Sequence, residues 1–157
     1  YSSAASDVYK RQVDEPGLPM LEEALETYPR LKFIGHSQPF WHEISQDAKP
    51  DLKSRMEWGK GPVKEGGRLV CLMRNYKNLY ADLSANSGGC AIMRDEKFGL
   101  QFLEEFQDRL MFGTDMVNTD MVFPLGEWLD RQYQEGKLSA QAYRKICFEN
   151  AKKIFQL

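Results

Sequence analysis

The chain has 157 residues, of which 42% are hydrophobic and 12% aromatic, and its formal net charge is -2. This composition is typical of a globular domain and excludes an intrinsically disordered chain. The balanced charge gives no reason to expect a nucleic acid or an anionic membrane as a partner, and no apolar run approaches the ~20 residues that a membrane span needs.

The first twelve residues show no clear helical or strand period. They resemble a translated sequencing adapter, and a natural disordered terminus is the alternative. Residues 1–12 are therefore set apart as a non-native or disordered segment, and the domain is expected to span residues 13–157.

Helical and strand patterns alternate along the rest of the chain. A helix is predicted from Leu18 and ends before Pro29, because the residue before a proline is pushed out of the α-helical conformation. Apolar runs predict strands at 31–35, 79–82 and 110–112. Amphipathic patterns predict helices at about 68–76, 98–106, 123–134 and 139–155, and a helix or turn is expected at 39–44. This α/β alternation predicts a parallel sheet, and Ser139 is the expected N-cap of the last helix.

The last predicted helix carries an apolar stripe that is expected to be buried, formed by Tyr143, Ile146, Cys147, Ala151, Ile154 and Phe155. The segment 45–67, in contrast, is mostly polar and rich in glycine in its second half. A long segment without clear structure inside a compact domain is often functional, so a binding loop or a lid is expected there.

Chemistry-bearing side chains follow all three predicted strands. His36 follows the first, Asp82 ends the second, and Asp115 follows the third. Because catalytic groups of parallel barrels lie at the carboxyl ends of the strands, one reaction centre is expected at this edge. Asp115 can ligate Zn²⁺ and take a proton from its bound water, and His36 can bind a metal, orient a substrate or move a proton. Capping by Asp115 and a structural hydrogen bond of His36 are the alternatives.

Side chains near these positions extend the candidate site. Gly113 is expected to let the backbone turn sharply, and Thr114 to donate a hydrogen bond to the Asp115 carboxylate. Asp82 is expected in a supporting or structural role, paired with Arg94. The segment 84–89 offers backbone N–H groups for an anion or, more commonly, a close-packed turn.

Arg94 and Trp41 are candidates for substrate binding, and Trp58 for a pocket wall, with simple packing as the alternative for the tryptophans. His42 is a weaker candidate, since its spacing from His36 suits joint metal ligation poorly.

Cys71, Cys90 and Cys147 are scattered and form no C-x-x-C pair. Such a set argues against a disulfide framework and a thiolate zinc site, and it favours a reducing compartment, so a cytoplasmic protein is expected. Their expected role is that of small buried hydrophobic side chains.

Four motifs in order resemble the amidohydrolase-related family of metal-dependent hydrolases and decarboxylases. The run Leu31-Lys32-Phe33-Ile34-Gly35-His36 resembles its sixth strand, residues 78–84 its seventh, residues 109–115 its eighth, and residues 150–155 its closing helix. The resemblance covers residues 17–157. It implies the C-terminal part, about strands 6–8 with their helices, of a (β/α)8 TIM barrel.

The resemblance also implies roles for the candidate residues. Asp115 corresponds to a metal ligand or general base, and His36 to a metal ligand or catalytic acid/base. The implied cofactor is a divalent metal, with Zn²⁺ expected, that activates water against a C–N or C–O bond of a small-molecule substrate. The family's first-strand His-x-His pair and fifth-strand ligand have no match here, so the expectation is a fragment that is inactive alone.

Two other functions remain open from the sequence. A non-oxidative decarboxylase would use the same fold, because fold does not determine chemistry. A non-catalytic α/β binding module, complete as it stands, would need no metal. A homo-oligomer of the intact enzyme is compatible with either enzymatic reading.

Overall fold

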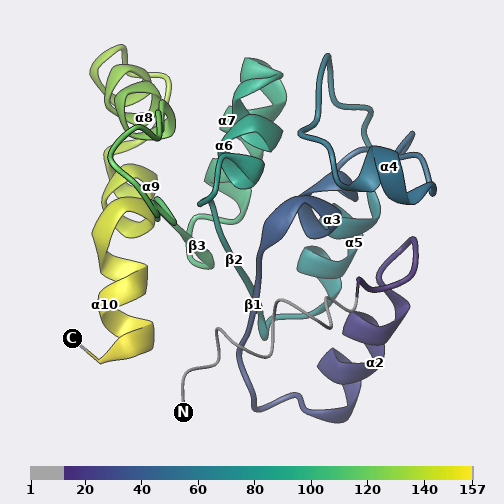
Figure 1. The fold of residues 1–157 in the computed structure, drawn as a ribbon. Coiled ribbons are helices and arrows are strands. Elements are labelled where there is room, and N and C mark those ends of the chain that lie inside the picture. The colour runs from purple at the N-terminus through teal and green to yellow at the C-terminus, as the bar shows by residue number, and fades with distance from the viewer. Residues whose placement is uncertain (1–12, 157) are drawn as a thin grey trace.

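A small parallel sheet organises the chain (Figure 1). The computed structural model describes residues 13–156, so the interpretation of residues 1–12 lies outside the described residues. Strands β1 (Phe33–Gly35), β2 (Leu79–Asp82) and β3 (Leu110–Met111) lie in the order β1-β2-β3 and are parallel. All three carboxyl ends therefore reach the same edge of the sheet, as the α/β alternation predicted.

Helices connect and flank these strands. The first ends at Thr27, just before Pro29, and the remaining predicted helices form close to their expected positions. The described helices are α2 (Pro19–Thr27), α3 (Ser37–His42), α4 (Leu52–Arg55), α5 (Arg68–Asn75), α6 (Ser87–Met93), α7 (Glu96–Glu105), α8 (Leu125–Gln134), α9 (Ala140–Arg144), the π-helical turn η1 (Lys145–Glu149) and α10 (Asn150–Phe155). Ser139 caps α9 as predicted, because its side chain accepts a hydrogen bond from the Ala142 N–H.

One apolar cluster packs against one face of the sheet. Leu79, Ala81 and Leu110 are fully buried in it. Helix α5 adds Leu69, Leu72 and Met73 to this cluster, and helix α7 adds Phe102 and Leu103. Ile34 points to the opposite face and is 38% exposed, and its paired neighbour Tyr80 is only partly buried. The two faces of the sheet are therefore covered unequally.

A π-helical turn interrupts the predicted final helix at η1. Its Ile146 carbonyl accepts a hydrogen bond from the Phe112 N–H at 2.8 Å, directly after β3. A wider turn also changes the phase of the residues that follow it. Of the stripe predicted to be buried, Ile146 is fully buried and Phe155 is 57% exposed, and the partly buried members are Tyr143, Cys147, Ala151 and Ile154.

The segment 45–67 contains a short helix, α4, and is anchored to the rest of the fold. The Val63 N–H donates to the Asp95 carboxylate at 3.0 Å, and the Lys64 N–H donates to Ser45 Oγ at 2.9 Å. Arg55, only 4% exposed, lies 3.8 Å from the Glu43 carboxylate. These contacts anchor the segment to the rest of the fold. Its action as a lid stays a prediction.

The cysteines are unpaired thiols and are partly buried. Burial raises the pKa of Cys147 to about 11 and raises the pKa of Cys90. Both thiols therefore stay protonated at neutral pH, in keeping with a packing role. Within residues 13–156, the structure contains no helix that is both long enough and apolar enough to cross a membrane.

Candidate functional site

His36 joins the ends of the three strands. It follows β1, and its Nδ1 lies 3.0 and 3.2 Å from the two carboxylate oxygens of Asp82, at the end of β2. An ionised carboxylate only accepts hydrogen bonds, so Nδ1 carries a proton and donates it. His36 Nε2 lies 3.8 Å from Oδ2 of Asp115, after β3. The structure thus brings together the two principal candidates, His36 and Asp115, with Asp82 behind the ring.

The Asp82 carboxylate is held by Ser84, two residues further along the chain. The Ser84 hydroxyl and its backbone N–H both donate to Asp82 Oδ1, the latter at 3.1 Å. Ser84 Oγ also lies 3.3 Å from His36 Nδ1. The sequence analysis gave Ser84 no role of its own, although a serine two residues after an aspartate is a known local hydrogen-bonding pattern.

The backbone at the end of β2 is fixed by Trp41. Its indole N–H donates to the Asp82 carbonyl at 3.1 Å, and the side chain is 2% exposed. Helix α6 packs tightly against this point, since a Cβ on Gly88 would lie 2.6 Å from Leu83 Cα and 3.0 Å from Trp41 Nε1. Trp41 therefore supports the site from the protein interior.

Electrostatics favour the charged forms of the pair. The hydrogen bond with Asp82 raises the pKa of His36 above its ordinary 6.5, against the opposing effect of burial, and the charges of Asp82 and Asp115 add to the rise. Burial acts to raise the pKa of Asp82, but the hydrogen bonds from His36 and Ser84 outweigh it and the pKa is lowered. Asp82 is therefore an anion at neutral pH, beside an imidazole with increased proton affinity.

Asp115 lies on the exposed side of this arrangement, with 54% of its side chain accessible. Its φ of +51° shows that Asp115 itself, and not Gly113, adopts the left-handed conformation, which aspartate tolerates better than most residues. Gly113 allows a close approach instead, because a Cβ there would lie 3.3 Å from Ser84 Cβ. Among the described hydrogen bonds, Thr114 contributes its carbonyl, which accepts from the Ala85 N–H at 3.2 Å, and not the predicted side-chain bond.

The predicted pairing of Asp82 with Arg94 is wrong. Arg94 lies at the far end of α6 and donates to the Lys60 carbonyl at 3.2 Å. Residues 87–89 form the first turn of α6, and Ala85 and Asn86 before them form a turn with φ of +56°, in line with the turn predicted for part of this segment. His42 is held by the Lys49 carbonyl, 2.9 Å from its Nε2, which is a structural contact.

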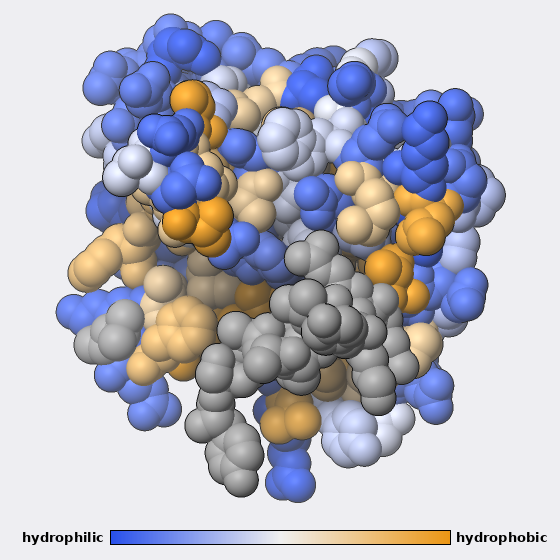
Figure 2. Space-filling view, viewed as in Figure 1, coloured by the Kyte–Doolittle hydropathy of each residue, from blue (hydrophilic) through white to orange (hydrophobic). Residues whose placement is uncertain are grey.

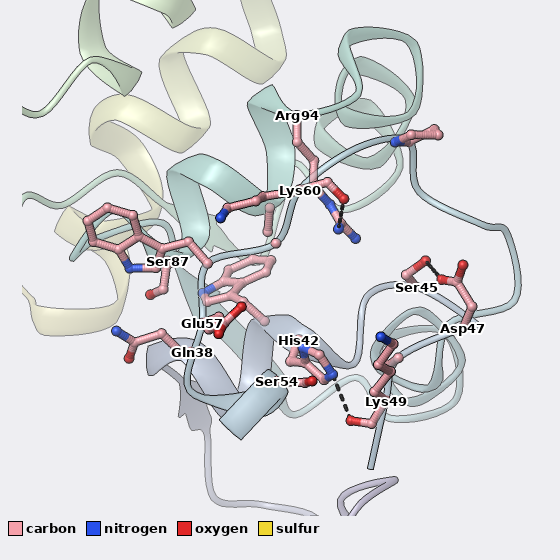
Figure 3. Close-up of a pocket in the computed structure, with 16 residues that line it drawn as sticks. Gln38, His42, Ser45, Asp47, Lys49, Ser54, Glu57, Lys60, Ser87 and Arg94 are labelled. Carbon is pink, nitrogen blue, oxygen red and sulfur yellow. Dashed lines mark hydrogen bonds between the residues drawn. The ribbon is translucent and has the colours of Figure 1, made fainter. Parts of the chain in front are cut away.

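A pocket of about 260 Å³ lies beside the strand ends (Figure 3). Trp41, Arg94 and Trp58, all suggested by the sequence, line it together with residues of the segment 45–62. His36, Asp82 and Asp115 are not among its lining residues. The cluster and the pocket are therefore separate but adjacent, because Trp41 lines the pocket and also donates a hydrogen bond to the Asp82 carbonyl.

The described residues offer only part of the ligand set that a metal ion needs. Within residues 13–156, no three His, Cys, Asp or Glu side chains form a group that could hold a metal. The donor chemistry of His36 and Asp115 nevertheless suits zinc, because metal-binding histidines commonly donate their other ring N–H to a carboxylate, as His36 does to Asp82. These two residues could supply at most two ligands.

Comparison with known proteins gives one match. Residues 8–157 match the model of a protein family described as amidohydrolase. No curated protein and no solved structure matches the chain.

Proposed function

Since the chain belongs to the amidohydrolase family, we propose that His36 and Asp115 serve a metal-dependent hydrolase that cleaves a C–N or C–O bond of a small molecule. The observation that carries this proposal is the convergence of His36, Asp82 and Asp115 at the carboxyl ends of three adjacent parallel strands. This edge is where enzymes built on parallel barrels hold their catalytic groups.

Asp82 acts as the residue that orients His36. By accepting a hydrogen bond from the Nδ1–H group, Asp82 fixes the ring, and Nε2 is left facing Asp115. A neutral ring presents a lone pair at Nε2, and a protonated ring presents a proton there. Without a bound metal the raised pKa of His36 favours the second state, and a protonated His36 can protonate or stabilise the reacting group.

Asp115 acts as the ligand and proton acceptor. Its exposed carboxylate, 3.8 Å from His36 Nε2, can hold a divalent metal, and neutral His36 can add Nε2 to the coordination. A bound Zn²⁺ would supply a Lewis acid that lowers the pKa of water to about 7. Further ligands would come from residues beyond the described set.

We also propose that the sheet is part of a (β/α)8 barrel, with β1, β2 and β3 as its sixth to eighth strands. Purely parallel sheets occur almost only with both faces covered. Here Ile34 is 38% exposed on the face opposite the apolar cluster. In a barrel this face would be the packed interior, filled by side chains from the other strands.

The test is Zn²⁺ affinity, measured by isothermal titration calorimetry of the metal-stripped protein and of its Asp115→Asn variant. We expect Asp115→Asn to weaken binding by about tenfold or more, since an anionic ligand is lost. Asp120→Asn, an exposed carboxylate of the same loop, is the matched control and should leave affinity unchanged. Equal Zn²⁺ affinity of the parent protein and of Asp115→Asn would contradict the proposed role of Asp115.

A further inference from the structure

The pocket beside the strand ends combines a small volume with an unusual arrangement of charge. Its volume of about 260 Å³ is slightly below the range of sites for drug-sized ligands, so it suits a molecule of about one ring. The charged lining residues are Lys49, Lys60, Arg94, Asp47 and Glu57. Three cations against two carboxylates leave a positive excess in the wall.

Arg94 is the cation at the inner side of this wall. Its Nε is buried and makes no hydrogen bond, and one terminal N–H donates to the Lys60 carbonyl at 3.2 Å (Figure 3). No carboxylate of residues 13–156 lies within ion-pair distance of the guanidinium. The carboxylate of Asp47 in the lining accepts a hydrogen bond from the Ser45 hydroxyl at 2.6 Å, and together with Asp95 it acts on Arg94 by its charge without direct contact.

The Arg94 guanidinium also packs against Gly59. A Cβ on Gly59 would lie 2.7 Å from Arg94 Nη1 and 2.9 Å from Cζ, so the cation packs directly on the backbone. Burial lowers the pKa of Arg94, and the charges of Asp47 and Asp95 offset this effect only in part. A partly desolvated cation without a contacting counterion gains most from an incoming anion.

Trp58 supplies a flat apolar surface in the same lining. Its side chain is 49% exposed, whereas Trp41 on the interior side is 2% exposed. An exposed indole and a cation in the lining of one pocket suit a ligand that has both a planar ring and a negative charge, because the ring can stack while the charge meets the guanidinium.

We propose that this pocket is a binding site for a small planar carboxylate, with Arg94 recognising the carboxylate and Trp58 stacking on the ring. The site requires neither a metal nor the His36 cluster, so it stands independently of the hydrolase proposal. Trp41 connects the two sites structurally, since it lines the pocket and donates to the Asp82 carbonyl.

The experiment is a titration of the protein, with EDTA present, by four probes and with calorimetric detection. The probes are benzoate, its neutral analogue benzamide, non-planar cyclohexanecarboxylate and inorganic phosphate. We expect benzoate to bind tightest. Loss of a charge-assisted hydrogen bond predicts that Arg94→Gln weakens benzoate by roughly tenfold to a hundredfold. Trp58→Leu should weaken benzoate by roughly three- to tenfold and cyclohexanecarboxylate less.

Three further variants make the result specific. Gly59→Ala keeps the positive charge but displaces the guanidinium, so it should weaken benzoate without unfolding the protein. Arg30→Gln removes an exposed arginine outside the pocket and should have no effect. Asp115→Asn should leave benzoate binding unchanged even if it abolishes Zn²⁺ binding.

Several outcomes would overturn the assignment. Equal affinity for benzamide and benzoate would show that the charge of the ligand plays no role. Unchanged benzoate affinity in both Arg94→Gln and Gly59→Ala would show that Arg94 does not recognise the carboxylate. If phosphate bound more tightly than benzoate, the site would not select a planar carboxylate. Loss of benzoate binding in Asp115→Asn would show that the pocket is not independent of the proposed metal site. If none of the four probes bound, the binding site itself would be refuted.

Discussion

The substitution Asn150→Ala tests how the start of β3, the strand that precedes Asp115, is held in place. Asn150 is 5% exposed, and its side-chain amide donates to the Leu110 carbonyl at 2.8 Å and to the Gln107 carbonyl at 2.6 Å. One side chain thus anchors both the loop before β3 and the strand itself. Alanine would leave both carbonyl groups without this donor.

The expected loss of stability follows from these two hydrogen bonds. A buried polar group left without its partner costs about 1–3 kcal/mol. Because the Gln107 contact is only partly buried and water can replace the donor there, the loss in unfolding free energy should be about 2–4 kcal/mol in total. Urea unfolding followed by circular dichroism would measure this loss as a lower midpoint at unchanged slope.

Asn75→Ala provides the matched control. Asn75 is exposed at the end of α5, so its replacement should change stability by less than about 0.5 kcal/mol. If Asn150→Ala were equally mild, the two hydrogen bonds would not hold β3, and the positioning of Asp115 would need another explanation.

Two further predictions concern the site itself. Asp82→Asn removes the main cause of the raised pKa of His36, so an NMR titration should give a lower His36 pKa than in the parent protein. Because the pKa of His36 is raised in the folded state, its protonation stabilises the fold fully at pH values below the unfolded-state pKa near 6.5. This stabilisation is lost as the pH rises through the folded-state pKa. The difference in unfolding free energy between the parent protein and Asp82→Asn should therefore shrink with rising pH. An unchanged His36 pKa would mean that Asp82 does not orient the ring. Gly88→Ala should cost about 1–3 kcal/mol in thermal or urea unfolding, since its Cβ would meet the Leu83 backbone, whereas Gly126→Ala in α8 meets only ordinary contacts and should be neutral or slightly stabilising.

The strands and their end residues could be predicted because local patterns determine them. Short apolar runs give the strands, and parallel strands place their following residues at one edge, which is why His36 and Asp115 meet as expected. The partner of Asp82 could not be predicted in this way. The pairing of Asp82 with His36 depends on the register that sets Gly35 beside Ala81, whereas the partner predicted from the sequence was Arg94.

The remaining differences arise from contacts between segments far apart in the chain. The π-helical turn is stabilised by a hydrogen bond from Phe112, which no periodicity within residues 139–155 can reveal. The left-handed conformation likewise falls on Asp115, because Gly113 is used for close approach to Ser84. In both cases a tertiary contact decides a local conformation.

The two halves of the candidate site are held very differently. His36, Asp82 and Ser84 lie at the ends of adjacent strands and share a network of hydrogen bonds, so the ring orientation is strongly determined. Asp115 follows the shortest strand and is 54% exposed, and within residues 13–156 its carboxylate accepts no hydrogen bond in the 2.5–3.5 Å range. A carboxylate with open acceptor positions, facing a preoriented imidazole nitrogen, is the part of the site that can still take up a cation or a proton. Asp115→Asn should therefore weaken Zn²⁺ binding while leaving stability nearly unchanged, whereas Asp82→Asn should affect both.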